Sequence, residues 1–136
     1  MLFRSTRGQD CHKTFEEILL AGLASDGGLF IPEKWPQVDL KAIKKCKSFV
    51  EIAHHIVPLF TDSSYTQEEV KEIVESTWHD FKSKNLIEIH NFDNNVFVAE
   101  LFHGPTAAFK DFGLQLCAAF FNTCLLYTSD AADDLR

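Results

Sequence analysis

Lys110 is the residue whose surroundings in the sequence are most unusual for its chemical type. It lies in an almost wholly apolar stretch, Val98–Phe121, in which Glu100 and Asp111 are the only other formally charged residues. A lysine is almost never fully buried unless it is paired or takes part in chemistry. Burial and the positive end of a helix both disfavour an ammonium group and favour the nucleophilic amine. Schiff-base chemistry with an aldehyde cofactor requires such an amine.

The same residues are compatible with a structural role. Most lysines beside apolar helices extend to water or pair with a neighbour, which here would be Asp111. His103 lies in a turn between a strand and a helix, where a histidine with satisfied hydrogen bonds is as typical as a catalytic one. Spacing alone therefore leaves both interpretations open for Lys110 and for His103.

The elements that would position Lys110 are a strand, a turn at Gly104 and Pro105, and a helix with Thr106 near its start. We expect Lys110 in about the first turn of this helix. The helix is apolar on most of its circumference, which predicts that it is buried inside a larger body.

Three amphipathic helices are predicted upstream, each from a Ser or Thr followed three residues later by Glu, a pattern that satisfies two backbone donors at a helix start. The pairs are Thr14 with Glu17, Ser48 with Glu51, and Thr66 with Glu69. Pro58 ends or kinks the second helix, and the third keeps helical spacing as far as Phe81. Apolar runs predict strands at 2–4, 29–31, 86–89 and 96–101, the last two joined by a turn-rich stretch.

Composition excludes several classes of protein. The chain has 136 residues, of which 46% are apolar and 24% charged, and its net charge of −7 opposes nucleic-acid binding. No apolar run has the length of a membrane span, and no signal peptide is expected. The four cysteines show no CxxC pair, which predicts reduced thiols and a cytoplasmic location. The histidines show no metal-ligand spacing, so no metal site is expected.

Residues 102–115, FHGPTAAFKDFGLQ, resemble the pyridoxal-phosphate attachment segment of the threonine synthase family. Upstream segments match the N-terminal domain of that family in order and spacing: STRG at 5–8, FEEILLAGLASDGGLFIPEKWP at 15–36 and SFVEIA at 48–53. The resemblance covers the chain from Met1 to about Asn122. Ala107 departs from the family, because many members carry a bulkier apolar residue there.

The resemblance implies an α/β fold in which a threonine synthase N-terminal domain precedes the start of a tryptophan-synthase β-like domain (PLP fold type II), truncated here. The family's enzymes are lyases acting on phosphates. They convert O-phospho-L-homoserine and water to L-threonine and phosphate, the last step of threonine biosynthesis. Lys110 would hold pyridoxal 5'-phosphate as an internal aldimine, and its freed amine would move protons on the substrate carbons. No role is transferred to His103, Thr106 or Asp111.

Residues 124–134, CLLYTSDAADD, resemble the in-frame translation of a transposase sequencing adapter. We therefore expect three parts: residues 1–94 as the N-terminal domain, 95–123 as the start of the cofactor-binding domain, and 124–136 as a non-native tail. Such a fragment lacks the glycine-rich loop for the cofactor phosphate. We expect it to be inactive alone and prone to aggregate through its apolar surface.

Two other functions are compatible with these residues. One is a threonine-synthase-like phospho-lyase that acts on related γ-phosphorylated amino acids. The other is a small non-catalytic interaction module in which residues 102–121 dock on a partner helix or sheet. A small-molecule substrate is expected in the two enzymatic cases, and neither nucleic acid nor a membrane is an expected partner.

Overall fold

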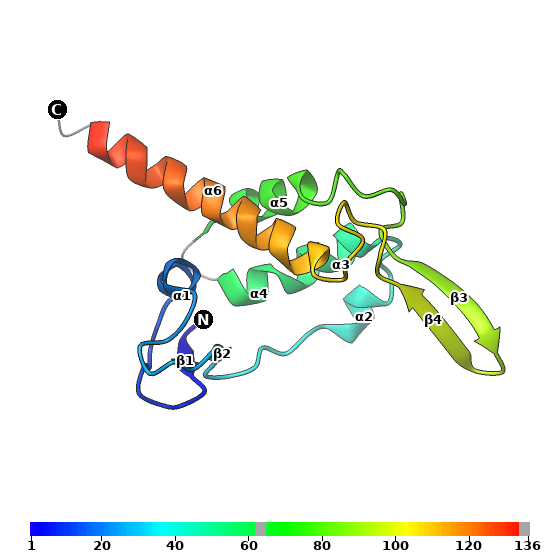
Figure 1. Cartoon of the computed structure of the whole chain (residues 1–136), viewed down its shortest axis with the longest axis horizontal. Coiled ribbons are helices and arrows are strands. Elements are labelled where there is room, and N and C mark those ends of the chain that lie inside the picture. Colours follow the sequence, from blue (N-terminus) through cyan, green and yellow to red (C-terminus); the bar gives the residue numbers. More distant parts are fainter. Residues whose placement is uncertain (62–64, 134–136) are drawn as a thin grey trace.

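The computed structural model describes residues 1–61 and 65–133, with side chains described as far as residue 125 (Figure 1). The structure combines helices and strands, in agreement with the predicted α/β class. In chain order the elements are β1 (Phe3–Ser5), α1 (Phe15–Ala21), β2 (Phe30–Pro32), α2 (Leu40–Ile43), α3 (Phe49–Ile56), α4 (Pro58–Thr61), α5 (Gln67–Ser76), β3 (Glu88–Asp93), β4 (Val96–Glu100) and α6 (Asp111–Asp133). Within the described ranges, none of these helices combines the length and the apolar character that crossing a membrane requires.

All three predicted helix starts are confirmed, two of them with the full reciprocal cap. Thr14 and Thr66 each accept a bond from the backbone of the glutamate three residues on, and that glutamate's side chain accepts one from the cap backbone. Ser48 forms only half of the arrangement. Its hydroxyl accepts from the N–H of Glu51, whereas the Glu51 carboxylate turns back to the N–H of Lys47 at 2.6 Å.

The predicted end of the third helix is wrong. α5 ends at Ser76 and does not reach Phe81. Thr77 leaves the helix in an extended conformation, and its hydroxyl donates to the carbonyl of Ile73 at 2.7 Å. Trp78 then takes a positive φ of 64°, which a continuing helix does not allow. The backbone reverses here and buries the indole of Trp78 under the helices.

The strands form two separate antiparallel pairs. β1 pairs with β2, with Arg4 opposite Ile31. β3 and β4 form the predicted hairpin, with His90 opposite Val98, although β3 begins at Glu88 and not at Leu86. Figure 1 shows this hairpin extending away from the helices.

α6 connects two clusters of packed side chains. The main core is centred on α3, α5 and the segment that follows α5; its buried members are Ala53, Val70, Val74, Trp78 and Leu86. Phe112, near the start of α6, packs against the rings of Phe49 and Phe81 in this core. Phe120, two turns further along, packs against Phe15 and Tyr65 at ring-centre distances of 5.1 Å. One helix thus joins the N-terminal segment to the main core.

α6 continues without a break across residue 124, where the proposed tail begins. Cys124 is buried, and its thiol lies 3.4 Å from a carboxylate oxygen of Glu16 on α1. Burial raises the pKa of Cys124, and the Glu16 carboxylate adds to that effect. Burial also raises the pKa of the neighbouring Tyr65 to about 12. That residues 124–136 are a non-native tail stays a prediction, because it concerns where the sequence came from. Residues 134–136 lie outside the described ranges.

The first strand is held to the loop before β2 by a side-chain hydrogen bond. Ser5, which is 1% exposed, donates from its hydroxyl to Asp26 at 2.7 Å. The same carboxylate oxygen accepts the N–H of Gly28 at 2.8 Å. Glycine is required at position 28, because a Cβ there would lie 2.1 Å from the Ser5 hydroxyl. The Ser5 hydrogen bond is the largest of the effects that lower the pKa of Asp26.

Candidate active site

Residues 101–110 connect β4 to α6 and carry Lys110. The start of this connection is tied to the rest of the molecule at His103. Its carbonyl accepts the backbone N–H of Lys82 at 2.8 Å, and its ring nitrogen Nε2 lies 2.9 Å from the carboxylate of Glu100. The ring of Phe102 packs beside the His103 imidazole, with 4.8 Å between ring centres. His103 therefore has the contacts of a turn histidine that anchors this connection.

A small group of titratable side chains surrounds His103 at the base of the hairpin. Glu100 contacts two imidazoles, because His90 lies 3.3 Å from its second carboxylate oxygen. Glu88, directly opposite Glu100 in the hairpin, accepts hydrogen bonds from Ser83 and Asn85. The Ser83 hydroxyl is the largest of the effects that lower the pKa of Glu88, and the two nearby imidazoles add to it. No group of three or more metal-ligating side chains is found within the described residues.

The turn that precedes α6 is closed by the side chain of Asp111. One carboxylate oxygen accepts the N–H of Thr106 at 2.9 Å, and the other accepts the Thr106 hydroxyl at 2.6 Å. Asp111 is 4% exposed, whereas Thr106 is exposed, so the bonds join a buried carboxylate to a residue at the surface. Gly104 lies against the same carboxylate, since a Cβ at this position would be 2.3 Å from an Asp111 oxygen. Three residues of the segment that resembles the attachment site therefore form one locked turn.

Ala107, the departure from the family pattern, occupies a strained position in this turn. Its φ is 57°, and its N–H donates to the carbonyl of Gly104 at 3.1 Å. A left-handed conformation costs an L-residue with a Cβ roughly 1–2 kcal/mol. The contacts between Thr106 and Asp111 compensate for this cost, because they close the turn on both sides of Ala107.

The side chain of Lys110 is exposed in this chain. Lys110 directly precedes α6, and its carbonyl accepts the N–H of Leu114 at 2.9 Å, so it lies at the start of the helix as expected. Its apolar neighbour Phe109 is 65% exposed and does not cover it. Asp111 does not pair with it either, since that carboxylate is directed to Thr106. Among the described residues no carboxylate forms an ion pair with Lys110, which leaves its amine accessible.

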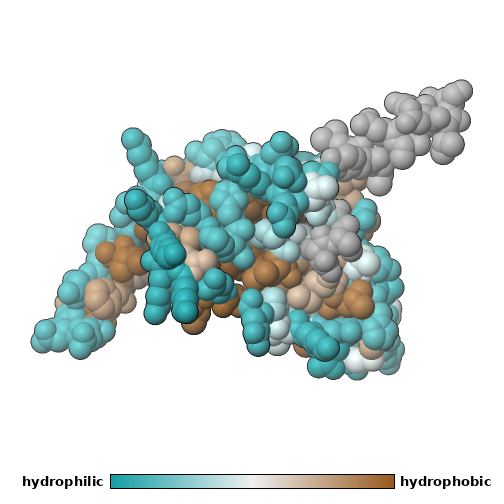
Figure 2. Space-filling model, turned by 180° about the vertical axis from the view of Figure 1, so that it is seen from behind, coloured by the Kyte–Doolittle hydropathy of each residue, from teal (hydrophilic) through white to brown (hydrophobic). Residues whose placement is uncertain are grey.

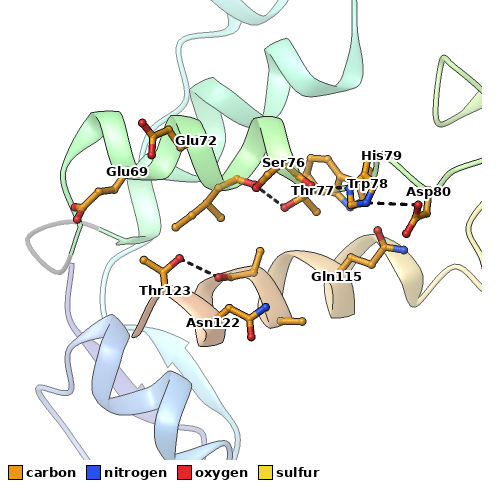
Figure 3. Close-up of a pocket in the computed structure, with 13 residues that line it drawn as sticks. Glu69, Glu72, Ser76, Thr77, Trp78, His79, Asp80, Gln115, Asn122 and Thr123 are labelled. Atoms are coloured by element: carbon orange, nitrogen blue, oxygen red, sulfur yellow. Dashed lines mark hydrogen bonds and ion pairs between the residues drawn. The ribbon is translucent and has the colours of Figure 1, made fainter. Parts of the chain in front are cut away.

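A groove of about 660 Å³ lies between α5 and α6 (Figure 3). Glu69, Glu72 and Ser76 of α5 line one wall, and Gln115, Asn122 and Thr123 of α6 line the other. Trp78 closes one end, where its indole N–H donates to the carbonyl of Phe112 at 2.9 Å. Lys110 is not among the lining residues, so this groove and the lysine turn are separate features.

Sequence reasoning singled out Lys110 and the turn at Gly104 and Pro105, but not the hydrogen bonds from Thr106 to Asp111 that close this turn. A threonine and an aspartate five residues apart match neither the helical nor the strand period, so no standard pattern pairs them. The signal was nevertheless present, because a carboxylate beside an apolar run needs a hydrogen-bonding partner when it is buried. The geometry defines a class of site: an exposed, unpaired lysine amine on a rigid turn ahead of a long helix, which suits covalent chemistry with a carbonyl group.

Comparisons with known proteins agree with the order of these elements. A model of the threonine synthase N terminus matches residues 2–78. Threonine synthases of Pseudomonas aeruginosa and Schizosaccharomyces pombe are 42% and 41% identical to the chain, over 85% and 88% of its length. The crystal structure of pyridoxal-phosphate-bound threonine synthase from Brucella melitensis superimposes with a TM-score of 0.87 at 37% identity, over 95% of the chain.

The chain belongs to the threonine synthase family. It spans about a quarter of the relatives it matches: 25% of the Pseudomonas protein, 24% of the Schizosaccharomyces protein and 28% of the Brucella chain. The α/β architecture is accordingly that of the N-terminal portion of these enzymes.

Proposed function

We propose that this chain forms the N-terminal part of a threonine synthase that converts O-phospho-L-homoserine and water to L-threonine and phosphate. The observation that carries the proposal is the exposed amine of Lys110, held on a locked turn in a segment that resembles the family's attachment site. The match of the whole N-terminal region to threonine synthases supports it. The enzyme class is then a carbon–oxygen lyase acting on phosphates.

Pyridoxal phosphate is the proposed cofactor, and Lys110 fits it. An aldehyde needs an amine that is accessible and free of a carboxylate partner, and the Lys110 side chain meets both conditions among the described residues. When bound, the cofactor supplies an electron sink for the substrate carbons. When not bonded to the cofactor, the Nζ of Lys110 would be free to accept and return protons at those carbons. Asp111 is not available as a competing base, because Thr106 occupies both of its oxygens.

We propose residues 1–94 as the N-terminal domain, 95–123 as the start of the PLP fold type II domain, and 124–136 as a non-native tail. The match of residues 2–78 to the family's N terminus supports the first part. The four cysteines are unpaired in the described structure, which supports a cytoplasmic location. Since the chain spans a quarter of its relatives, we further propose that it neither retains the cofactor nor turns over substrate alone.

The test uses a chimaera that joins residues 1–123 to the part of the Pseudomonas aeruginosa threonine synthase beyond the matched segment. The chimaera is incubated with pyridoxal phosphate, reduced with borohydride and digested, and the labelled peptide is sequenced by mass spectrometry. We expect the label on Lys110 and release of phosphate from O-phospho-L-homoserine. Lys110→Ala should abolish both, whereas Lys84→Ala, which removes another exposed lysine, should leave both unchanged.

The alternatives give different results. Phosphate release only from other γ-phosphorylated amino acids would identify a phospho-lyase. No label on any lysine of residues 1–123 would contradict the enzymatic proposal and favour an interaction module. A stable cofactor absorbance band in the isolated 136-residue chain, lost in Lys110→Ala, would contradict the proposed inactivity of this chain alone.

A further inference from the structure

We propose that Asp111 is a positioning residue for Lys110, because its carboxylate holds the lysine-bearing turn in a single conformation. The inference rests on the proposed role of Lys110 as the residue that carries the cofactor. It assigns to the Asp111–Thr106 contact a function that is separate from the stability of α6.

The direction of the hydrogen bonds is the main argument. A carboxylate at the start of a helix ordinarily accepts N–H groups of the helical residues that follow it. Asp111 instead accepts two donors from Thr106, five residues before it, at 2.9 and 2.6 Å. These bonds close a ring of residues 106–111, and Lys110 lies inside that ring. The carboxylate therefore constrains the loop of residues 106–111 that precedes α6, and it does not cap the first helical turn of α6.

Burial strengthens the constraint. Asp111 is 4% exposed, although Lys110 on one side and Phe109 before it are exposed. A hydrogen bond to a charged group is stronger when water cannot compete for it. Loss of the carboxylate would leave the N–H of Thr106 without this partner, so the turn would relax.

Gly104 restricts the carboxylate from the opposite side. The nearest atoms to a Cβ at this position are all of Asp111: an oxygen at 2.3 Å, Cβ at 2.6 Å and Cγ at 2.8 Å. The turn is tightened further by hydrogen bonds from Ala107 to Gly104 and from the Asp111 N–H to Ala108, both 3.1 Å. Gly104, Thr106 and Asp111 thus form one unit around the lysine, with no contact to its amine.

A double-mutant cycle in the chimaera tests this unit. The apparent dissociation constant for pyridoxal phosphate is measured by absorbance for the wild type, Asp111→Asn, Thr106→Val and the double variant, together with kcat and KM. Each single variant should weaken cofactor binding about tenfold, the effect of one hydrogen bond to a charged group. The double variant should lose about the same factor, because the two residues act as one unit. Glu72→Gln, which removes an exposed charge on α5, is the matched control and should bind as the wild type does.

Rescue separates positioning from folding. Thr106→Ser keeps both donors and should bind the cofactor within about twofold of the wild type, whereas Thr106→Val should not. This pair decides the question even if Asp111→Asn fails to fold, because both variants retain Asp111. A lower kcat with unchanged KM and unchanged thermal midpoint would support positioning of the reacting amine.

Different results would contradict the positioning role of Asp111 and the proposed function. Losses that add to about a hundredfold in the double variant, or equal binding by Thr106→Ser and Thr106→Val, would contradict the positioning role of Asp111. A wild-type chimaera that never binds pyridoxal phosphate would contradict the proposed function, and the role toward Lys110 with it. Amide exchange at Thr106 in the 136-residue chain then shows whether the turn itself is closed as described: protection lost in Asp111→Ala, which removes the acceptor, confirms the contact, and equal exchange contradicts it.

Discussion

The helical body buries the apolar side chains of its core, whereas the β3–β4 hairpin leaves most of its apolar side chains exposed. In the body, Val70, Val74 and Trp78 are at most 4% exposed. In the hairpin, Phe92 is 79% exposed and Phe97 is 63% exposed. The hairpin backbone is nevertheless fully registered from Glu88 opposite Glu100 to Asn91 opposite Phe97.

Both faces of the hairpin are apolar, which distinguishes it from an ordinary surface hairpin. Ile89 and Phe97 lie on one face, and Val96 and Val98 on the other, because side chains alternate along each strand. Figure 2 shows the resulting apolar surface on the projecting hairpin. Strands that are apolar on both faces are typical of the interior of a larger sheet. The two strands have thus paired although further protein would be needed to cover the apolar side chains of the hairpin, whereas the helical body buries its own core.

The largest expected effect is the difference between removing an aromatic ring from the body and removing one from the hairpin. Trp78→Ala deletes a side chain that is 4% exposed and that donates to Phe112, so it should destabilise the chain by about 3–5 kcal/mol. Phe92→Ala deletes one that is 79% exposed and should change stability by less than about 0.5 kcal/mol. Urea unfolding of the 136-residue chain, followed by far-UV circular dichroism, measures both.

Trp35→Ala is the control for the loss of a tryptophan as such. Trp35 is 71% exposed, and its ring meets the ring of Phe60 edge-on with 6.5 Å between ring centres, so its removal should cost far less than that of Trp78. Equal losses for Trp78→Ala and Phe92→Ala would mean that the hairpin is as well packed as the body.

The next expected effect concerns association between copies of the chain. Two exposed phenylalanines, Phe92 and Phe97, on an open-edged hairpin should promote self-association. Replacing both, Phe92→Lys with Phe97→Lys, should weaken association by at least about tenfold in sedimentation velocity, since each ring contributes about 1.5–3 kcal/mol when buried. Leu20→Lys with Leu40→Lys makes the same charge change on two exposed leucines of the helical body, away from the hairpin, and should leave association nearly unchanged. A larger loss of association in the leucine double variant than in the phenylalanine double variant would show that the chains associate through the helical body.

The features that sequence reasoning predicted correctly are those that depend on near neighbours in the chain. Thr14 and Thr66 cap their helices through residues three positions away, and the β3–β4 turn joins strands that are adjacent in sequence. The missed end of α5 depends on Trp78, whose left-handed backbone allows its indole to reach Phe112 on α6. A contact 34 residues away leaves no trace in the local pattern.

The candidate site shows the same division. The residue type and its apolar neighbours singled out Lys110, and its helix was expected to be buried inside a larger body, whereas Phe109 and Leu114 are exposed in this chain. An apolar segment indicates that a surface will be covered and does not say by which part of a protein. The Thr106–Asp111 contact was not predicted because a five-residue spacing belongs to a turn closed by side chains, and not to a regular element.

The smallest expected effect is a pH dependence in the N-terminal body. The hydrogen bond from Ser5, followed by backbone N–H groups of Gly28 and Gln9, lowers the pKa of Asp26 in the folded chain. A carboxylate with a lowered pKa contributes stability above its unfolded value, about 3.9, and loses that contribution as the pH falls through the folded value. The thermal midpoint of Asp26→Asn should therefore lie below that of the wild type at pH 7, and the two should converge as the pH is lowered past 4.

Ser5→Ala removes the largest cause of this shift and sharpens the test. In the Ser5→Ala background, Asp26→Asn should produce a smaller drop at pH 7 than it does in the wild type, because the hydroxyl that favours the charged carboxylate is gone. A difference between wild type and Asp26→Asn that stays constant from pH 7 to pH 3 would show that the ionised form of Asp26 is not what joins β1 to the loop before β2. The stability of this junction would then come from packing and from the β1–β2 pairing, and the contrast with the hairpin, which has strand pairing but exposed side chains, would rest on burial alone.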